Sequence, residues 1–374
     1  MMHDARTAFT PPIRSVVIPM AAGIGNAVLA GPLVRQLYAG LGRPHVTVIA
    51  YNRGIAGVFE NMAEVAEVSV SGPGPRGLMR FVRWTRRRRP DLYLVPYPSN
   101  RWQYDALLAT SGARRRVIHG YSTRRRRRAD TAAVTRVPVV PGLHDVQQNL
   151  RLLTALGVTP DDTRTPRFDL SSDHVAAGDA VLAGVGVKAG EPFVTVHPGS
   201  GDTGWGSAKR WPVEHFGALC RRVLDDGSVR QVMVLEGPDE PGLAARVIAA
   251  TSDAASLVAL RLRGPLAQSA AVLRRARLHV GSDSAMAHLA SAVGTPTVVI
   301  YGPTDPASCR PISAPHRSVR LNKWCAPCFA YPQRATRPTV RCRPPFCINE
   351  VSVDSVADAV RQALAGRFTD IGGA

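Results

Sequence analysis

Polar residues that could bind phosphate gather in one short stretch, Asp283-Ser284 followed by His288. A short apolar strand is predicted at 278–280, and the apolar spacing after Ser284 predicts a helix whose first amides the Asp283 and Ser284 side chains could cap. Residues 295–301 predict a buried parallel strand. In such a β–α–β unit the helix N-terminus favours phosphate. An ordinary capped helix has the same order of elements, and the density of polar residues favours a binding site.

The composition predicts a globular protein with anionic partners. At 374 residues the chain is long enough for two domains, and its formal net charge is +19 with a pI near 10.8. Almost all of the positive charge is arginine, because Lys188, Lys209 and Lys323 are the only lysines. An arginine-rich, alanine-rich composition is typical of a GC-rich genome. The remaining excess predicts contact with phosphates, an acidic membrane surface or nucleic acid.

The first apolar stretch, 13–34, resembles a membrane span in composition only. It contains Pro19, Gly23, Gly25 and Asn26 within a few residues, and such helix-breaking residues are unfavourable for a span. The stretch instead predicts a strand, a glycine-rich turn and a helix. The two glycines lack the third glycine of a dinucleotide fingerprint. We therefore expect no targeting segment, no transmembrane helix and a cytoplasmic protein, with peripheral contact to the inner face of the inner membrane.

Strands and helices alternate in both halves of the chain, which predicts an α/β fold with two Rossmann-like domains. The predicted strands lie at 15–19, 45–50, 92–95 and 117–118 in the first half, and at 193–196, 232–235, 257–260, 278–280 and 295–301 in the second. Helices are predicted at 144–157, 266–275 and 353–365, among others. The expected organisation is an N-terminal domain at 1–165, a linker at 166–190, a C-terminal domain at 191–350, and a closing helix and tail at 351–374.

Ordered motifs cover nearly the whole chain. They are GIGNAVLAGPLVRQL, GARRRVIHGY, HDVQQNLRLLTALGV, VHPGSG, KRWP, GPDE, VGSDSAMAHLASAVGTP and YGPTDP. In this order they resemble the heptosyltransferase family, glycosyltransferase family 9. The resemblance implies a GT-B fold, in which two Rossmann-like domains with parallel sheets face each other across a cleft. It also implies inverting transfer of a sugar, typically heptose from ADP-heptose, onto a lipopolysaccharide-core or related glycolipid acceptor, with no cofactor required for transfer.

The resemblance assigns a donor site to the C-terminal domain. Lys209 matches the diphosphate contact, Asp283 and Ser284 match a second phosphate and sugar contact, and a carboxylate at Asp239 or Glu240 could accept hydrogen bonds from ribose hydroxyls. The expected donor-binding residues are Gly199, Ser200, Gly201, Lys209, Asp239, Glu240, Asp283, Ser284, Ala285 and His288. The alternatives are a surface charge for Lys209 and a half-buried structural role for His288.

Two positions depart from the family pattern. Many members have Gly-Asp where this chain has Gly25-Asn26, and an amide cannot take a proton from the acceptor hydroxyl. Asn26 could still orient that hydroxyl, so the expected catalytic set is Asn26, Lys209 and Asp283, and the acceptor side is Gly25, Asn26, Arg53 and Arg101. The base would then be another residue, with His144, Asp145, Asp105 and Glu60 as candidates, or the acceptor differs. Ala285 replaces a family glycine, which would be costly only at positive φ.

Four cysteines in a proline- and arginine-rich loop, 322–348, have the spacing C-x2-C…C-x4-C. They are Cys325, Cys328, Cys342 and Cys347. In a cytosolic protein this spacing favours a metal over disulfides, and four thiolates suit a structural zinc ion. Unrelated thiols or reversible disulfides are the alternative.

Three other functions remain open. The same scaffold could use another sugar or acceptor, or the chain could be a sugar-nucleotide epimerase that works on the nucleotide sugar alone. A nucleic-acid-binding protein is the third, suggested by the arginine runs at 86–89, 114–116 and 124–128. Taken singly, each run predicts a solvated surface. Because the runs lack interleaved aromatic residues and match no nucleic-acid module, we expect no nucleic-acid partner and favour an anionic membrane.

Overall fold

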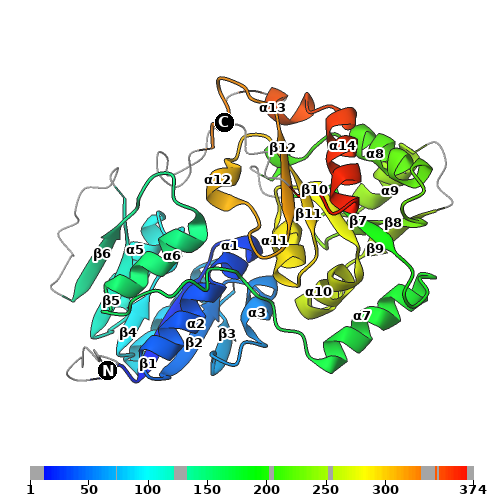
Figure 1. Cartoon of the computed structure of the whole chain (residues 1–374). Helices are drawn as coiled ribbons and strands as arrows, with labels where there is room; N and C mark the ends of the chain where they lie inside the picture. Colours follow the sequence, from blue (N-terminus) through cyan, green and yellow to red (C-terminus); the bar gives the residue numbers. More distant parts are fainter. Residues whose placement is uncertain are drawn as a thin grey trace, which may run out of the picture. The chain divides into compact units, whose positions relative to one another are not determined.

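The computed structural model describes residues 12–72, 74–121, 133–201, 206–251, 256–329, 342 and 345–368. The chain forms two compact units, the first running to Arg164 and the second beginning at Thr165. Each unit contains one six-stranded parallel sheet with helices packed against it (Figure 1). This is the α/β architecture of two Rossmann-like domains that the sequence predicts.

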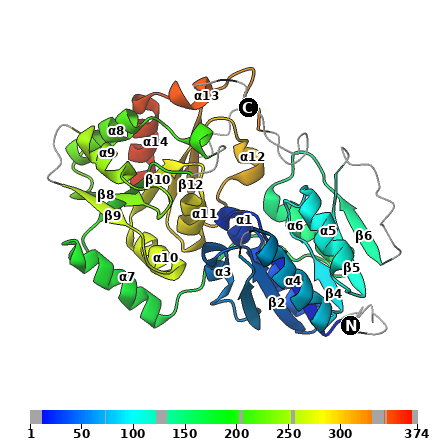
Figure 2. The ribbon, with the colours of Figure 1, turned by 180° about the vertical axis from the view of Figure 1, so that it is seen from behind.

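Unit 1 is organised around β1, because the chain adds strands on both sides of it in the order β3-β2-β1-β4-β5-β6. The strands are β1 (Ser15–Met20), β2 (His45–Ala50), β3 (Glu67–Val70), β4 (Leu92–Leu94), β5 (Arg115–Gly120) and β6 (Val134–Pro138). The helices are α1 (Ile24–Leu29), α2 (Gly31–Gly40), α3 (Arg53–Phe59), α4 (Gly74–Arg88), α5 (Trp102–Thr110) and α6 (Asp145–Thr154). Helices α2 and α6 pack together over the face of the sheet seen in Figure 1, and α4 and α5 lie over the face seen in Figure 2.

Unit 2 repeats this topology with the order β12-β11-β10-β7-β8-β9. The strands are β7 (Phe193–His197), β8 (Gln231–Glu236), β9 (Leu257–Arg261), β10 (Leu278–Ser282), β11 (Thr297–Tyr301) and β12 (His316–Arg320). The helical elements are α7 (Ser172–Gly184), a 3-10 turn at Ser207–Lys209, α8 (Val213–Asp225), α9 (Leu243–Ala249), α10 (Leu266–Arg275), α11 (Ala285–Ala292), α12 (Pro306–Cys309), α13 (Phe346–Asn349) and α14 (Val353–Leu364).

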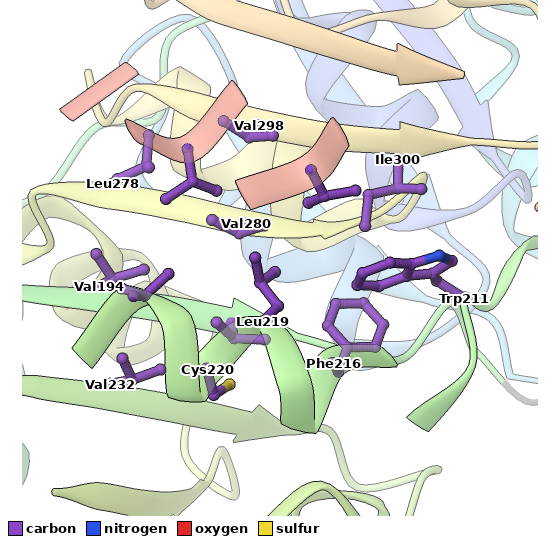
Figure 3. Packing of buried hydrophobic residues seen from close by; sticks show 14 of the residues in the cluster. Val194, Trp211, Phe216, Leu219, Cys220, Val232, Leu278, Val280, Val298 and Ile300 are labelled. Carbon is purple, nitrogen blue, oxygen red and sulfur yellow. The ribbon is translucent and has the colours of Figure 1, made fainter. Parts of the chain in front are cut away.

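The core of unit 2 explains why its central strands are runs of valine and isoleucine. Side chains of Val194, Val280 and Ile300 leave three neighbouring strands on one face and pack against α8 (Figure 3). A parallel strand that is covered on both faces needs apolar residues at nearly every position. Phe216 and Trp211 extend the same core toward the end of the sheet at which the polar site lies.

The stretch predicted as a linker, 166–190, is mostly the helix α7, and it belongs to unit 2. Helix α7 packs on α10, where a Cβ atom on Gly178 would lie only 2.5 Å from the Cβ of Ala271. The many small residues of α7 allow this close approach, and they also weaken the apolar periodicity by which a sequence predicts a helix. Among the described residues no helix is long and apolar enough to cross a membrane.

Candidate active site

The polar residues of unit 2 lie where its sheet topology changes direction. From β7 the chain continues through β8 and β9 on one side, and from β10 through β11 and β12 on the other, so β7 and β10 are the neighbours at the switch point. Open parallel sheets bind ligands at the carboxyl ends of such strands. His197 ends β7 and Ser282 ends β10. The stretches 199–201 and 283–285 follow directly.

The N-terminus of α11 is left uncapped by side chains, contrary to the predicted capping by Asp283 and Ser284. Ser284 is the N-cap residue, but its side chain makes no capping hydrogen bond. Its Oγ instead lies 3.2 Å from Nδ1 of His197, and Asp283 accepts a hydrogen bond from Lys209. The first amides of α11 therefore carry the partial positive charge of a helix N-terminus without a capping hydrogen bond to the side chain of Ser284. Ala285, the first residue of α11, is not among the described residues with positive φ, so the missing glycine causes no backbone strain.

Lys209 and Asp283 form a largely buried ion pair, with Nζ 3.1 Å from Oδ2. Burial raises the pKa of Asp283, but the nearby Lys209, His288 and Thr304 more than offset this and hold it below its ordinary value. Burial lowers the pKa of His288 to about 4, although the Asp283 carboxylate opposes the shift. At neutral pH the Asp283 carboxylate is therefore ionised and His288 is neutral.

A second buried pair joins His197 to Glu240, with Nε2 of the histidine 3.0 Å from Oε2. The other carboxylate oxygen accepts from the backbone N–H of Gly201 at 2.9 Å and lies 3.4 Å from the Arg210 guanidinium. Burial raises the pKa of Glu240, while His197, the Gly201 amide and Arg210 outweigh it and lower the pKa to about 2. A Cβ atom on Gly199 would lie 2.0 Å from this carboxylate, so any larger residue there would displace Glu240 from its partners.

The loop 199–201 is thus held in place by hydrogen bonds from its own residues to Glu240 and to the start of α11. The hydroxyl of Ser200 donates to the carbonyl oxygen of Asp283 at 2.7 Å and ties the loop to the start of α11.

Of the two predicted ribose partners, Asp239 is exposed, whereas Glu240 is buried and already accepts from several donors. The structure brings all the predicted donor residues to this end of unit 2, around the carboxyl ends of β7, β8 and β10.

Two residues of the site had no role in the prediction, His197 and Trp211. His197 links Glu240 to Ser284, which lie 44 residues apart in the sequence, and only the fold reveals it. Trp211 is 1% exposed; its N–H donates to Ser282 and its Nε1–H donates to the Val351 carbonyl. Its position in the KRWP motif, two residues after Lys209, is the signal that could have identified it.

In unit 1 the predicted acceptor-side residues follow the central strands β2, β1 and β4. Asn26 lies in α1 after β1, Arg53 is the first residue of α3 after β2, and Arg101 is the N-cap residue of α5 after β4. The start of α3 is against α1, since a Cβ atom on Gly54 would lie 2.8 Å from Cδ1 of Ile24, the neighbour of Gly25. Arg53 and Arg101 are both exposed.

The candidate replacement bases differ in their surroundings. The Asp105 carboxylate forms an ion pair with Arg136 at 3.1 Å, and Glu60 is at the C-terminal end of α3. His144 is the buried N-cap residue of α6, where its Nδ1 accepts from the Val146 amide, and Asp145 is the first residue of that helix. These contacts do not distinguish which of the four residues is the base, so its assignment stays a prediction.

The four cysteines of the predicted metal site influence one another electrostatically. Burial, together with the three other thiols, Cys328, Cys342 and Cys325, raises the pKa of Cys347 to about 11. Cys325 and Cys328 are exposed, Cys342 is partly exposed and Cys347 is buried. Within the described part of the chain, no three histidine, cysteine or acidic side chains are grouped closely enough to hold a metal ion.

Known proteins resemble this chain in sequence and in fold. The sequence profile of the family described as "Glycosyltransferase family 9 (heptosyltransferase)" matches residues 103–337. Lipopolysaccharide heptosyltransferase 3 of Escherichia coli K12 is 24% identical over 294 residues, which cover 77% of this chain and 82% of that protein.

Two solved structures match along nearly their full lengths. One is a family 9 glycosyltransferase from Veillonella parvula, with a TM-score of 0.76 and 17% identity over 95% of this chain and 98% of that one. The other is ADP-heptose LPS heptosyltransferase II of E. coli, with a TM-score of 0.72 and 18% identity over 95% of this chain and 100% of that one. Because the family profile spans more than half of a chain whose fold and motifs agree with it, this protein is a glycosyltransferase that belongs to glycosyltransferase family 9.

Proposed function

We propose that this enzyme transfers heptose from ADP-heptose, with inversion, onto a lipopolysaccharide-core or related glycolipid acceptor. The observation that carries the proposal is the buried pair of Lys209 and Asp283 beside the uncapped N-terminus of α11. A nucleotide diphosphate sugar needs positive charge where its leaving diphosphate develops negative charge. The Lys209 ammonium and the α11 amides supply it, and Asp283 orients the lysine.

The nucleoside would bind beside the diphosphate, at the ends of β8 and β9. Here the Glu240 carboxylate fixes the turn at Gly201, and the exposed Asp239 is next to it for the ribose hydroxyls. A pocket adjoins these residues and could take the nucleobase. It is lined by Glu236, Gly237, Pro238, Pro241, Arg261, Leu262 and Arg263.

The acceptor would bind unit 1. Two exposed aromatic side chains, Tyr51 and Trp102, are neighbours in sequence of Arg53 and Arg101, and they follow the strands on either side of β1. Aromatic faces suit sugar rings, and arginines suit the phosphates of a phosphorylated glycolipid. Asn26 would orient the acceptor hydroxyl, and one of His144, Asp145, Asp105 or Glu60 would take its proton. The absence of an acid at position 26 also favours, as the second candidate, a different acceptor on the same scaffold.

A thermal-shift panel with ADP-, UDP-, GDP- and CMP-sugars tests the donor assignment. We expect ADP-heptose to raise the unfolding temperature, since a ligand present at 100 times its Kd stabilises the folded state by about 2.7 kcal/mol. The matched ADP-glucose sample shows how much of the shift the heptose contributes. A larger shift with a UDP-, GDP- or CMP-sugar would refute the choice of nucleotide.

We place the enzyme in the cytoplasm, in peripheral contact with an anionic inner membrane that holds the acceptor. The net charge of +19 supports this location, because exposed basic residues are attracted to anionic headgroups. Part of the predicted basic surface, Arg124–Arg128, lies outside the described residues. Unit 1 contributes further arginines in α4.

The cysteine loop would bind one structural metal ion through Cys325, Cys328, Cys342 and Cys347. Four thiolates suit tetrahedral zinc, and iron is the other metal that such a set accepts. The mutual influence of the four thiols on their pKa values supports this assignment, although binding would require the thiols to move into ligating positions.

Elemental analysis of protein purified without chelator is expected to give about one zinc per chain. Replacing Cys325 and Cys328 by serine should remove the metal, because two of the four ligands are lost. Replacing Cys220 and Cys309, which lie outside the loop, should leave it in place. A folded, metal-free wild-type protein would contradict the site, and iron in place of zinc would keep the site and change the metal.

A further inference from the structure

Helix α4 of unit 1 is strongly basic on its outer surface. Its sequence, GPRGLMRFVRWTRRR, contains no acidic residue, and all six of its arginines are exposed. They are Arg76, Arg80, Arg83, Arg86, Arg87 and Arg88. Only Gly77, Phe81 and Thr85 are buried, which places one narrow stripe of the helix against the unit. Figure 2 shows α4 on the outside of the sheet, and beside the buried stripe only Val82 and Trp84 are partly buried against the core of unit 1.

The arginines of α4 are mostly without acidic partners. Arg88 pairs with Glu67 at 2.7 Å and lies over the ring of Trp84 at 4.5 Å. Among the described residues, none of the other five arginines takes part in an ion pair. Four of these five, Arg76, Arg80, Arg83 and Arg87, line a surface groove together with Met79, Trp84 and Arg88. Five neighbouring cations that form no ion pair with a described residue repel one another, and an anionic partner would relieve that repulsion.

Apolar side chains lie among these cations. Met79 is 60% exposed and Leu78 is 40% exposed. At 100° per residue, Met79 falls between Arg83 and Arg86 on the outward face, and Leu78 lies beside the partly buried Val82 at the edge of that face. Phosphate groups of a nucleic acid would neutralise the arginines but leave this methionine in water. A lipid surface can neutralise the arginines and also remove the methionine from water, because its headgroups are anionic and its acyl boundary takes up apolar side chains.

We propose that α4 docks the enzyme on an anionic lipid bilayer, with its arginines at the headgroup phosphates and Met79 and Leu78 in the acyl boundary. The inference rests on the proposed glycolipid acceptor and names the element that brings the enzyme to it. Unit 1, which would bind that acceptor, thereby carries the membrane contact as well.

Co-sedimentation of the full chain with vesicles tests the proposal. Vesicles of phosphatidylcholine with 30% phosphatidylglycerol are compared with pure phosphatidylcholine at low and high salt. The variant Arg83→Gln/Arg87→Gln should bind the anionic vesicles about 25-fold more weakly, at about 5-fold per basic residue lost. The matched control Arg230→Gln/Arg274→Gln removes the same charge from exposed arginines of unit 2 that form no ion pair with a described residue, and it should change binding less than 2-fold.

A second variant, Leu78→Ser/Met79→Ser, keeps every charge and separates insertion from attraction. Its loss of binding should be greatest at high salt, where screening weakens the electrostatic part. Equal losses in the α4 and control arginine variants would overturn the proposal, as would vesicle binding that both α4 variants retain. The proposal would also be overturned if the α4 variants lost binding to a single-stranded oligonucleotide and kept their binding to vesicles. The thermal shift of each variant with ADP-heptose measures donor binding separately from vesicle binding. A wrong donor assignment would therefore abolish the thermal shift without changing the comparison of vesicle binding between variants.

Discussion

Replacing Lys209 with alanine is expected to lower kcat/KM for the nucleotide-sugar donor by about 10- to 150-fold, equivalent to losing a hydrogen bond to a charged group at about 1.5–3 kcal/mol. The Lys209 ammonium is held 3.1 Å from Asp283, beside the first amides of α11. Its charge is then in place before the leaving diphosphate develops its own. Steady-state kinetics over a range of donor concentrations measures the loss.

Lys188→Ala is the matched control, because Lys188 is an exposed lysine of the same unit. Its kcat/KM should be unchanged. Lys209→Ala also leaves the buried Asp283 carboxylate without its cation, which costs stability as well as activity. The double variant Lys209→Ala/Asp283→Asn should recover the unfolding temperature and not the activity. If Lys209→Ala retained full kcat/KM with a donor that the wild type uses, Lys209 would be a structural cation only.

The central strands of both sheets and the edge strand β9 could be predicted from sequence, and the other three edge strands could not. Strands β2 and β11 are buried along almost their whole length, and their runs of valine and isoleucine identify them. Strands β3, β6 and β12 lie at the edges of the sheets and mix polar with apolar residues. An edge strand is stabilised by its one neighbour, a long-range contact that leaves a weak trace in local sequence.

Helices α4 and α7 were missed for opposite reasons. The arginines of α4 hide a buried stripe of only three residues, so the segment 86–89 predicted a solvated run. In α7 the small residues that allow close packing on α10 leave little contrast between its faces. In both cases the neighbour that stabilises the helix lies far away in the sequence, and the helix pattern alone is too weak to reveal it.

The residues assigned to the donor site lie together at one end of unit 2, but the contacts among them were not predicted. The family resemblance indicated Lys209 and Asp283, and a carboxylate suited to ribose hydroxyls indicated Asp239 or Glu240. That Glu240 would accept from His197, and that Ser284 would pair with the same histidine instead of capping α11, depends on strand order. A sequence indicates which groups reach the carboxyl edge of a sheet, whereas the pairing among them follows from which strands are neighbours.

Trp211 determines where the KRWP segment lies, and its replacement should have the largest effect on stability. The side chain is 1% exposed, and its ring packs edge-to-face on Phe216 with centroids 5.0 Å apart (Figure 3). Its two N–H groups donate to Ser282 at the end of β10 and to Val351 before α14. One residue therefore fastens the loop that carries Lys209 to the core and to the strand that precedes Asp283.

Trp211→Ala is expected to lower the free energy of unfolding by about 3–5 kcal/mol, the cost of emptying a buried aromatic site. For a unit of this size that corresponds to a fall of about 6–20 °C in Tm. Trp324→Ala is the control, because Trp324 is 99% exposed and its loss should change stability by less than about 0.5 kcal/mol. Trp211→Phe keeps a ring against Phe216 and loses the hydrogen bond to Val351, so its Tm should lie between those of Trp211→Ala and Trp324→Ala. Equal Tm values for Trp211→Ala and Trp324→Ala would show that the Asp283 pair alone holds Lys209 in place.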